Sequence, residues 1–358
     1  MIKTEGIQYV GSKKKLVDHI INISNYYNIK TAIDGFSGTT RVSQAFKYNG
    51  NTVISNDISV YSKVFAQCYM LNKNKKSYYS DMIEHLNNLT PIYGWYSEHY
   101  GGDYNNGINL KSDKKMVWQI HNTMKLDAIR NEIDRIASNE IEKSVLLVSL
   151  INGLDPISNT MGHQVSYLKK WATKTNRILE LKVPDFIVDD LNHKVYQKDI
   201  FDITEYADLA YLDPPYGTNN KKMPSTRVRY NSYYHLWTTI CLNDNPNTVG
   251  LANRREDASS DKNGISVFEN VNEDFVLKNT KKLIDTLNVK YIIFSYNNKG
   301  RMAIDNLISL FNSNTTKLIN QFSFNHKENV MANSTITNEW LNEKDVKLQE
   351  FLFVIEKK

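Results

Sequence analysis

The sequence predicts an α/β fold in which a mainly parallel sheet carries an inserted, mostly helical region. Two observations lead to this fold class. Short apolar segments that end in acidic residues alternate with helical patterns in the first and last parts of the chain, whereas longer helical patterns dominate between residues 59 and 190. We therefore expect residues 1–58 and 191–358 to form the sheet domain and residues 59–190 to form the insertion.

The first part of the chain has the pattern of a βαβ unit. Apolar residues recur at helical spacing over residues 16–27, and residues 31–34 form a short apolar segment that ends in Asp34. A second helical pattern follows and stops at an Asn-Gly-Asn sequence, after which residues 52–57 again end in an acid, Asp57. A strand, a crossover helix and a second strand imply parallel pairing, and such sheets bind ligands at the carboxyl ends of their strands.

More strands are expected in the last part of the chain, at residues 193–197, 209–212 and 290–294. Residues 350–356 are expected to add an antiparallel strand at the edge of the sheet. In the insertion, helical patterns cover residues 115–136 and 141–151. If the strands are parallel, the polar residues at their ends gather along one rim, namely Asp34, Asp57, Asp199, Asp213 and Ser295.

The composition argues against several classes of protein. The richest apolar run, residues 145–151, is far shorter than the roughly 20 residues of a membrane span. The N-terminus lacks the pattern of a secretory signal, so we expect a cytoplasmic protein. Cys68 and Cys241 are far apart and predict neither a disulfide framework nor a metal site. The formal net charge of +5 permits a polyanionic partner without requiring one.

The sequence Asp213-Pro214-Pro215-Tyr216, directly after an expected strand, is the strongest chemical signal. Two prolines fix the backbone and leave their carbonyls free as acceptors, so they form a rigid corner. The Asp carboxylate and a Pro carbonyl can accept both hydrogens of an exocyclic amino group, and the Tyr ring offers a face for a flat base. In isolation such a sequence is as often only a stiff turn with a capping Asp, but its position at the rim favours the chemical interpretation.

A nucleoside-sized ligand is expected at the same rim. Residues 34–40 lie between a strand and a helix, where glycines let a ligand approach backbone amides, but a full Gly-x-Gly-x-x-Gly is missing, which argues against a dinucleotide. Asp57 is placed to bind ribose hydroxyls, and Asp199 to accept the amino group of an adenine. Each acid alone is more often an N-cap or a surface carboxylate, but three at one rim favour a ligand site.

Four segments, in this order, resemble the DNA adenine-N6 methyltransferases of the Dam type, which use S-adenosylmethionine. Tyr-Val-Gly-Ser-Lys at residues 9–13 resembles the N-terminal motif that helps to hold the methionine end of the cofactor. Residues 34–39 resemble the cofactor loop, and Asp57 takes the position of the ribose acid. Residues 198–201 look like the motif that contacts the cofactor adenine, and residues 213–216 are similar to the catalytic motif. Thr40 departs from the family, in which many members have a second glycine.

The resemblance implies a Rossmann-like class I methyltransferase sheet and assigns roles to residues. The Asp213 carboxylate and the Pro214 carbonyl would hold the target N6 amino group, Pro215 would complete the motif, and Tyr216 would stack on the flipped adenine. The cofactor would be held by Tyr9, Gly11, Lys13, Asp34, Phe36, Ser37, Gly38, Thr39, Asp57, Asp199 and Ile200. Residues 294–300 resemble a late strand-end motif that lines the target pocket, and the insertion takes the position of the region for target recognition.

Double-stranded DNA is the partner that the resemblance implies, in a restriction-modification or epigenetic system of a bacterium or phage with a possible cognate restriction endonuclease. Basic residues near aromatic residues are the candidates for contacting it, namely Lys169, Lys170, Lys221, Lys222, Arg227 and Arg229. Each cluster is equally compatible with a solvated helix face. Residues 158–164 have many polar donors and are expected to reach bases.

The chemistry of the expected site narrows the alternatives. Methyl transfer to an amino nitrogen depends on orientation and needs no covalent enzyme intermediate. Methylation at C5 of cytosine needs a thiolate, usually after a proline, and neither Cys68 nor Cys241 follows one, so we exclude it. Methylation of adenine in RNA stays open, as does a non-catalytic nucleic-acid-binding subunit, although intact Asp213 and Tyr216 argue against the latter.

Overall fold

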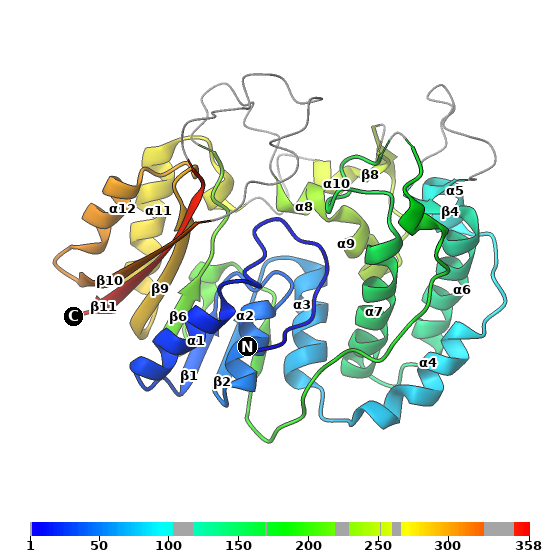
Figure 1. Ribbon diagram of the computed structural model, residues 1–358, viewed down its shortest axis with the longest axis horizontal. Coiled ribbons are helices and arrows are strands. Elements are labelled where there is room, and N and C mark those ends of the chain that lie inside the picture. Colours follow the sequence, from blue (N-terminus) through cyan, green and yellow to red (C-terminus); the bar gives the residue numbers. More distant parts are fainter. Residues whose placement is uncertain are drawn as a thin grey trace.

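The sheet lobe is built around a seven-stranded sheet, and a helical lobe lies beside it (Figure 1). The computed structural model describes residues 2–102, 117–168, 170–218, 229–250, 252–259, 266–325 and 347–358, and the elements given below belong to these ranges. The strand order is β10-β11-β9-β6-β1-β2-β5. From β9 to β5 the neighbouring strands are parallel, whereas β11 runs antiparallel to both of its neighbours.

The carboxyl ends of the neighbouring parallel strands lie at the same height in the sheet, where a ligand site is expected. The strands are β1 Thr31–Asp34, β2 Thr52–Asn56, β5 Lys194–Tyr196, β6 Ala207–Leu212, β9 Val289–Asn297, β10 Thr316–Asn325 and β11 Gln349–Lys357. Asp34 on β1 pairs with Ser55 on β2 and with Tyr211 on β6. The polar residues that follow these parallel strands therefore lie along one edge of the sheet, as the sequence predicts.

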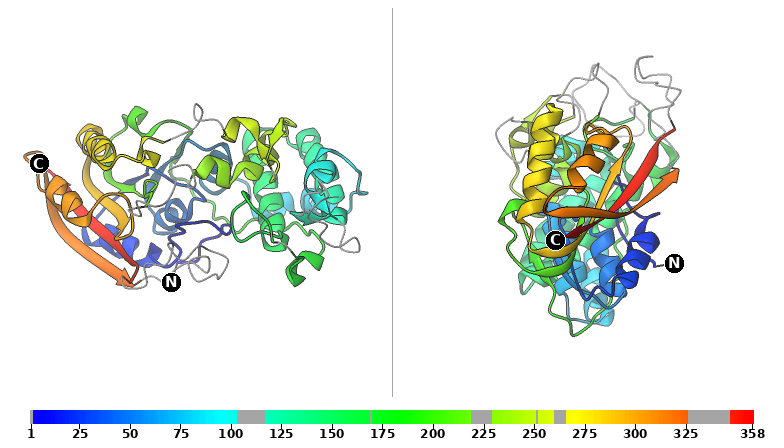
Figure 2. Two further views of the ribbon diagram at one scale, coloured as in Figure 1. Left: turned by 90° about the horizontal axis from the view of Figure 1, so that it is seen from above. Right: turned by 90° about the vertical axis from the view of Figure 1, so that its left-hand side faces the viewer.

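Helices cover both faces of the sheet (Figure 2). One face carries α1 Val17–Tyr26, α2 Arg41–Tyr48 and α3 Val60–Ala66, and the other carries α11 Glu273–Thr286 and α12 Ile304–Phe311. Successive strand residues point to opposite faces, so that Ala32 belongs to the first core and Ile33 to the second. Burial on both faces explains why the parallel strands have continuous apolar sequences.

Two separate segments of chain form the helical lobe. The first contributes α4 Ser80–Asn87, α5 Trp95–Tyr100, α6 Ile120–Ile136 and α7 Glu140–Leu154, and the second, after residue 216, contributes α8 Tyr230–Tyr233, α9 His235–Leu242 and α10 Glu256–Ser259. Short strand pairs add β3 Gly101–Gly102 with β4 Trp118–Gln119, and β7 Thr248–Val249 with β8 Arg254–Arg255. The fully buried Arg130 of α6 donates hydrogen bonds to the carbonyls of Ile240 (2.5 Å) and Cys241 (3.1 Å), which joins the segments.

One prediction about the sheet was wrong. β11 was expected at the edge, but it lies between β9 and β10, so β10 is the edge strand. β10 escaped prediction because it is exposed and largely polar, so apolar alternation does not mark it. The helix expected over residues 115–136 begins at Ile120, and Trp118–Gln119 before it form a strand instead.

No helix in the described ranges combines the length and apolarity that a membrane span requires. Within the same ranges, His, Cys, Asp and Glu side chains form no group of three that would bind a metal ion.

Candidate active site

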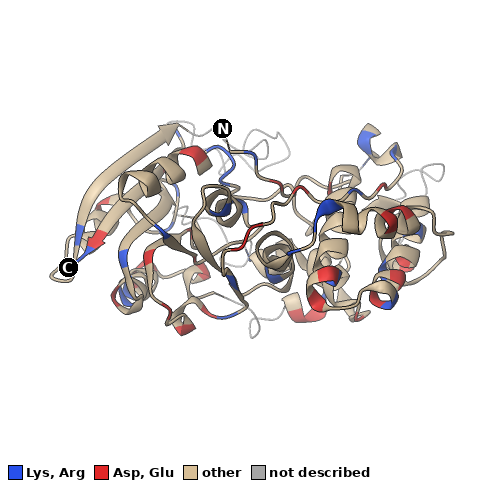
Figure 3. Ribbon diagram, turned by 90° about the horizontal axis from the view of Figure 1, so that it is seen from below, with Lys and Arg blue, Asp and Glu red and all other residues tan. Residues whose placement is uncertain are grey.

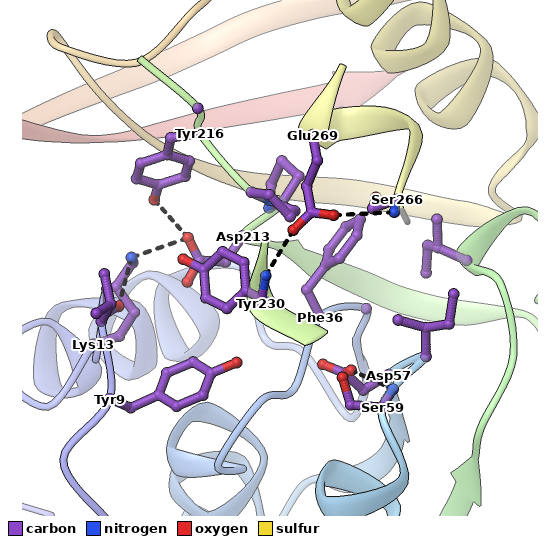
Figure 4. Close-up of a pocket in the computed structure, with 18 of the residues that line it drawn as sticks. Tyr9, Lys13, Phe36, Asp57, Ser59, Asp213, Tyr216, Tyr230, Ser266 and Glu269 are labelled. Carbon is purple, nitrogen blue, oxygen red and sulfur yellow. Dashed lines mark hydrogen bonds and ion pairs between the residues drawn. The ribbon is translucent and has the colours of Figure 1, made fainter. Parts of the chain in front are cut away.

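A pocket of about 480 Å³ opens at the carboxyl ends of the parallel strands (Figure 4). Its walls come from the N-terminal segment, the turns after β1, β2, β5 and β6, and the segment between the helical lobe and α11. Sequence prediction placed ligand-binding residues in most of these turns. We call the part around Asp213 the catalytic end and the part around Asp57 the adenosyl end, after the roles that the sequence predicts for these residues.

The turn after β6 places Asp213 at the catalytic end. Pro214 and Pro215 follow it and line the pocket, and Gly217 has φ +61°, a left-handed conformation that suits glycine. The carbonyl of Tyr216 accepts hydrogen bonds from the Arg301 amide (2.8 Å) and the Tyr296 hydroxyl (3.0 Å). Residues that follow or end β9 therefore fix the turn, in line with the late motif expected at residues 294–300.

Four polar side chains surround the Asp213 carboxylate. The Lys13 ammonium lies 3.0 Å from Asp213 Oδ1 and 3.2 Å from Glu350 Oε1, and it donates to the Gly11 carbonyl at 2.9 Å. The Tyr216 hydroxyl is 2.5 Å from Asp213 Oδ1 and 2.7 Å from Glu350 Oε1. Ser295 Oγ completes the group, 3.1 Å from Glu350 Oε1. We call Lys13, Asp213, Tyr216, Ser295 and Glu350 the catalytic cluster.

The catalytic cluster is buried, and its charges influence one another. Burial raises the pKa of Asp213, the Lys13 ammonium opposes this rise and the Glu350 carboxylate adds to it. Burial alone would lower the pKa of Lys13, but attraction to Asp213 and Glu350 outweighs it and the pKa is raised. Lys13 is therefore a stable cation at neutral pH, held by two carboxylates.

At the adenosyl end, backbone amides hold the Asp57 carboxylate in place. Gly38 N donates to Asp57 Oδ2 at 2.9 Å, and Ser59 N donates to Oδ1 at 2.8 Å. Burial raises the pKa of Asp57 although these hydrogen bonds oppose the rise. Each carboxylate oxygen keeps a further lone pair, so Asp57 can still accept hydrogen bonds from a ligand.

An apolar wall stands next to Asp57. Phe36 meets Phe268 edge to face with ring centroids 5.4 Å apart, and Phe201 stacks on Phe268 at 6.3 Å. Ile200 is buried beside them and lines the pocket, whereas Asp199 is exposed at its margin. A flat ring such as adenine fits a wall of this kind.

The N-terminal segment joins the pocket to the helical lobe. The ring of Tyr9 stacks on that of Tyr234, with centroids 4.3 Å apart and an interplanar angle of 18°. The Tyr234 hydroxyl accepts a hydrogen bond from Val10 N at 2.7 Å, and the Tyr9 hydroxyl is 3.0 Å from that of Tyr61. A pocket wall thus rests directly on the junction of α8 and α9.

The structure brings most of the predicted cofactor residues to the pocket. Those that line it are Tyr9, Gly11, Lys13, Phe36, Asp57, Asp199 and Ile200, together with residues 213–216 of the catalytic motif. Ser37, Gly38 and Thr39 lie behind Phe36 and are buried. Thr40, the residue that departs from the family pattern, adopts φ +63°, a conformation that glycine takes without strain.

Asp34 points into the core below the pocket. Its Oδ2 accepts hydrogen bonds from Ser43 N (2.9 Å) and Ser43 Oγ (2.6 Å), and its buried Oδ1 has no hydrogen-bond partner among the described residues. Burial raises the pKa of Asp34 to about 7; the hydrogen bonds from Ser43 oppose this rise and the charges of Asp213 and Asp57 add to it. Asp34 holds the first turn of α2 and is coupled electrostatically to both ends of the pocket.

The candidates for contacting DNA are only partly described. Lys170 is exposed on the helical lobe, and Arg229 is half-buried, close enough for its charge to lower the pKa of Glu269. Lys169, Lys221, Lys222 and Arg227 lie outside the described residues. Basic and acidic residues are interspersed on both lobes in the view of Figure 3.

Residues 158–164 do not form the exposed reading surface that was expected. Asn159 is fully buried and bonds to the Leu168 carbonyl and the Ala172 amide. Gln164 is 5% exposed, and its side chain accepts a hydrogen bond from Leu236 N. The polar groups of this segment mostly satisfy backbone groups inside the helical lobe, and Met161 is the exposed exception at 48%.

Sequence reasoning missed two carboxylates of the pocket. Glu350 is the second residue of β11, and its side chain is 6% exposed. Its signal in the sequence was an acid at the start of an otherwise apolar strand. Glu269 accepts from Tyr230 N (2.9 Å) and Ser266 N (3.3 Å), and burial raises its pKa to about 7. A Ser-x-x-Glu capping box at residues 266–269 was its signal.

Comparison with known proteins adds independent findings. A family profile described as D12 class N6 adenine-specific DNA methyltransferase matches residues 9–300. The chain is 28% identical over 320 residues to the type II methyltransferase M.NlaIII of Neisseria lactamica, which covers 85% of this chain and 87% of that protein. It is also 28% identical to the modification methylases LlaI of Lactococcus lactis subsp. lactis and StsI of Streptococcus sanguinis, over 85% of this chain. These matches cover 48% and 46% of the two methylases, so the chain spans about half of their length.

Proposed function

We propose that this chain, which belongs to the D12 class N6 adenine-specific DNA methyltransferase family, transfers a methyl group from S-adenosylmethionine to the N6 amino group of adenine at specific sites in double-stranded DNA. The observation that carries the proposal is the pocket in which the Asp213 turn and the Asp57 carboxylate share one cavity. Transfer between two bound molecules requires both in one water-poor space, and this pocket offers a position for each.

The residues of the adenosyl end fit S-adenosylmethionine. Asp57 offers two oriented carboxylate oxygens to ribose hydroxyls, the wall of Phe36 and Ile200 suits adenine, and Asp199 is free to face its amino group. When bound, the cofactor supplies a methyl group made electrophilic by its sulfonium charge. Five carboxylates line the pocket, namely Asp57, Asp199, Asp213, Glu269 and Glu350, against the amines of Lys13 and Lys198, a balance that suits a cationic ligand.

The catalytic end would hold and activate the target. The Asp213 carboxylate and the Pro214 carbonyl accept the two hydrogens of the adenine amino group, which directs electron density toward nitrogen. Tyr216 offers a ring face to the flipped base, and stacking of order 1–3 kcal/mol offsets part of the few kcal/mol needed for flipping. The methylated nitrogen then releases one proton, and the Asp213 carboxylate is the adjacent acceptor.

The assignment of partners and regions belongs to the same proposal. We assign target recognition to the insertion at residues 59–190, where Lys170 is exposed, and place further DNA contacts at the segment after the catalytic motif. The names of the relatives, modification methylases and a type II methyltransferase, support a restriction-modification role with a cognate endonuclease in the bacterial cytoplasm.

Asp213→Asn tests the function directly. The variant keeps the size of the side chain but loses the charge that accepts the amino hydrogens, so the methylation rate should fall by about 10²–10³-fold, the effect of removing one oriented charge-stabilising group. The assay is methyl-labelled S-adenosylmethionine with unmethylated bacterial DNA, followed by nucleoside analysis for N6-methyladenine.

The matched control is Asp202→Asn, because Asp202 is an exposed carboxylate of the sheet lobe that does not line the pocket. It should methylate DNA at the wild-type rate. If the wild type binds S-adenosylmethionine but methylates RNA and not DNA, the substrate assignment is wrong. If Asp213→Asn is as active as the control, the catalytic assignment is wrong.

A further inference from the structure

Two carboxylates of the catalytic cluster share the same two donors. The Tyr216 hydroxyl lies 2.5 Å from Asp213 and 2.7 Å from Glu350, and the Lys13 ammonium lies 3.0 and 3.2 Å from the same two oxygens. Asp213 belongs to the turn after β6, whereas Glu350 comes from β11, which is reached only near the end of the chain. The second carboxylate has no role in the mechanism given above.

In the ligand-free catalytic cluster, every hydrogen of the Lys13 ammonium and of the Tyr216 hydroxyl has an acceptor. The three hydrogens of Lys13 go to Gly11 O, Asp213 Oδ1 and Glu350 Oε1. The Tyr216 hydroxyl has one hydrogen and three acceptors within reach, namely Asp213 Oδ1, Glu350 Oε1 and Ser295 Oγ at 3.0 Å, so at any moment it donates to one of them. Figure 4 shows Tyr216 and Lys13 both directed at Asp213, the group that a target amino group needs as its acceptor.

We propose that Glu350 is a positioning residue for methyl transfer, because it is the acceptor to which Tyr216 and Lys13 turn when the target amino group takes up Asp213. This inference rests on the proposed function. Without Glu350, Asp213 would be the carboxylate left for both Lys13 and Tyr216, which would then compete with the target base for it, and Tyr216 would keep the neutral Ser295 Oγ as its other acceptor. With Glu350, the phenol keeps a hydrogen-bond acceptor and the buried ammonium keeps a counter-charge, so neither is left unpaired when the base binds.

The sheet gives Glu350 a fixed position. Its backbone is paired on both sides, with Asn297 on β9 and with Phe324 on β10. The side chain is 6% exposed, so water does not readily replace it, and Ser295 Oγ on β9 contacts the same carboxylate oxygen at 3.1 Å. The titratable groups that face the Asp213–Glu350 pair come from several elements, and among the described residues they are Lys13 from the N-terminal segment, Tyr211 from β6, Tyr216 from the turn and Tyr230 from α8. Asp34 at the end of β1 acts on Tyr211 and Asp213.

Glu350→Gln is the test, because the amide keeps the shape and an acceptor oxygen but removes the charge. We expect kcat to fall on the order of tenfold, the loss expected for one charge-assisted contact. The cofactor Kd should stay within about threefold of the wild type. The pH–rate profile, measured from about pH 5.5 to 9, should move to lower pH. The sign follows because Glu350 raises the pKa of Asp213, so the limb of the profile in which Asp213 loses its proton shifts to lower pH when Glu350 is removed.

Two further variants separate positioning from a structural role. Glu356→Gln is the matched control, a carboxylate on the same strand and the same sheet face but at the opposite end. It should leave kcat and the pH profile unchanged. Glu350→Asp keeps the charge and should restore the wild-type position of the profile. An unchanged profile in Glu350→Gln, or a loss of activity explained entirely by a lower melting temperature, would overturn the proposal.

One measurement does not depend on turnover. The titration of the Lys13 ammonium can be followed by NMR in lysine-labelled, cofactor-free protein, with the signal assigned by Lys13→Arg. We expect a lower pKa of Lys13 in Glu350→Gln than in the wild type, since Glu350 contributes to its rise. If the wild type fails to methylate DNA but this shift is present, the proposed function fails and the coupling of Glu350 stands. An unshifted signal contradicts the coupling.

Discussion

The two ends of the pocket are prepared for their ligands in different ways. At the adenosyl end, Asp57 lines the pocket and is held in place by the amides of Gly38 and Ser59. At the catalytic end, the groups that would hold a base are bonded to each other, with Tyr216 and Lys13 on Asp213. The adenosyl end is therefore complete before binding, whereas the catalytic end must exchange internal hydrogen bonds for those of the target.

Because of this difference, changes at the two ends should affect different quantities, the affinity for the cofactor at one end and the rate of turnover at the other. A preformed site loses little order when its ligand binds, so changes there should appear mainly in the cofactor Kd. A site that exchanges hydrogen bonds should respond mainly in kcat and its pH dependence, as expected above for Asp213 and Glu350. Three tests with variants outside the catalytic cluster sharpen the comparison.

Asp57→Ala should have the largest effect on cofactor binding. The carboxylate supports both the ligand and the Gly38 and Ser59 amides, so its removal leaves the loop without an anchor. We expect the Kd for S-adenosylmethionine, measured by calorimetry, to rise by about 100-fold, equivalent to roughly 2.7 kcal/mol. Asp199→Ala is the comparison, because among the described residues this exposed side chain holds the Phe201 amide and no loop of the pocket. A smaller effect of Asp57 than of Asp199 would contradict a preformed adenosyl end.

Asp34→Asn should change how stability depends on pH. Asp34 sits between the two ends, and its pKa is raised from 3.8 to about 7, mainly by burial. Between these values the folded protein binds more protons than the unfolded chain, so the free energy of unfolding falls as pH rises, by up to about 1.4 kcal/mol per pH unit. This contribution is complete below pH 3.8 and is lost as the pH passes 7.

Chemical denaturation of cofactor-free protein between about pH 5 and 8 measures this contribution. The free energy of unfolding of Asp34→Asn should fall less steeply than that of the wild type, because the amide does not titrate. Asp57 and Asp213, also raised, contribute in both proteins and cancel in the difference. Parallel curves for the two proteins would show that the raised pKa of Asp34 is wrong.

Gly38→Ala and Gly50→Ala form the smallest test. Both glycines have positive φ, +50° and +83°, so alanine should cost about 1 kcal/mol of stability at either position. A Cβ at Gly38 would lie 3.2 Å from the Tyr9 ring, whereas a Cβ at Gly50 meets nothing within 4 Å. We therefore expect the cofactor Kd to rise about tenfold for Gly38→Ala only. If Gly38→Ala and Gly50→Ala bind the cofactor with equal Kd, the loop at Gly38 does not shape the adenosyl end.

The sequence predicted the parts of the site that local pattern determines. Asp57, Asp199 and Asp213 follow parallel strands, and the level ends of such strands bring them to one rim. Glu350 could not be predicted in this way, because its place depends on pairing between β11 and β9 across a long stretch of chain. Asp34 was predicted as a ligand residue because of its position, but the direction of its side chain depends on Ser43 in the packed structure.

The contribution of residues after 216 to the helical lobe could not be predicted from local sequence pattern either, because it also depends on contacts between residues far apart in the chain. Helix α9 has the sequence of an ordinary apolar helix, and only its packing against α7 and its hydrogen bonds from Arg130 of α6 place it in the helical lobe. Arg130 shows the dependence, since its guanidinium bonds to carbonyls more than 100 residues away.

The two-segment composition of the helical lobe also limits how the chain can be re-engineered. An exchange of residues 59–190 with a relative would leave α9 facing foreign partners for Ile240 and Cys241, whose carbonyls receive the hydrogen bonds of Arg130. It would also alter the surface under Tyr234, on which Tyr9 stacks. On the proposed function, a chimaera intended to change the methylated sequence therefore has to exchange two segments together, the insertion and residues 230–259.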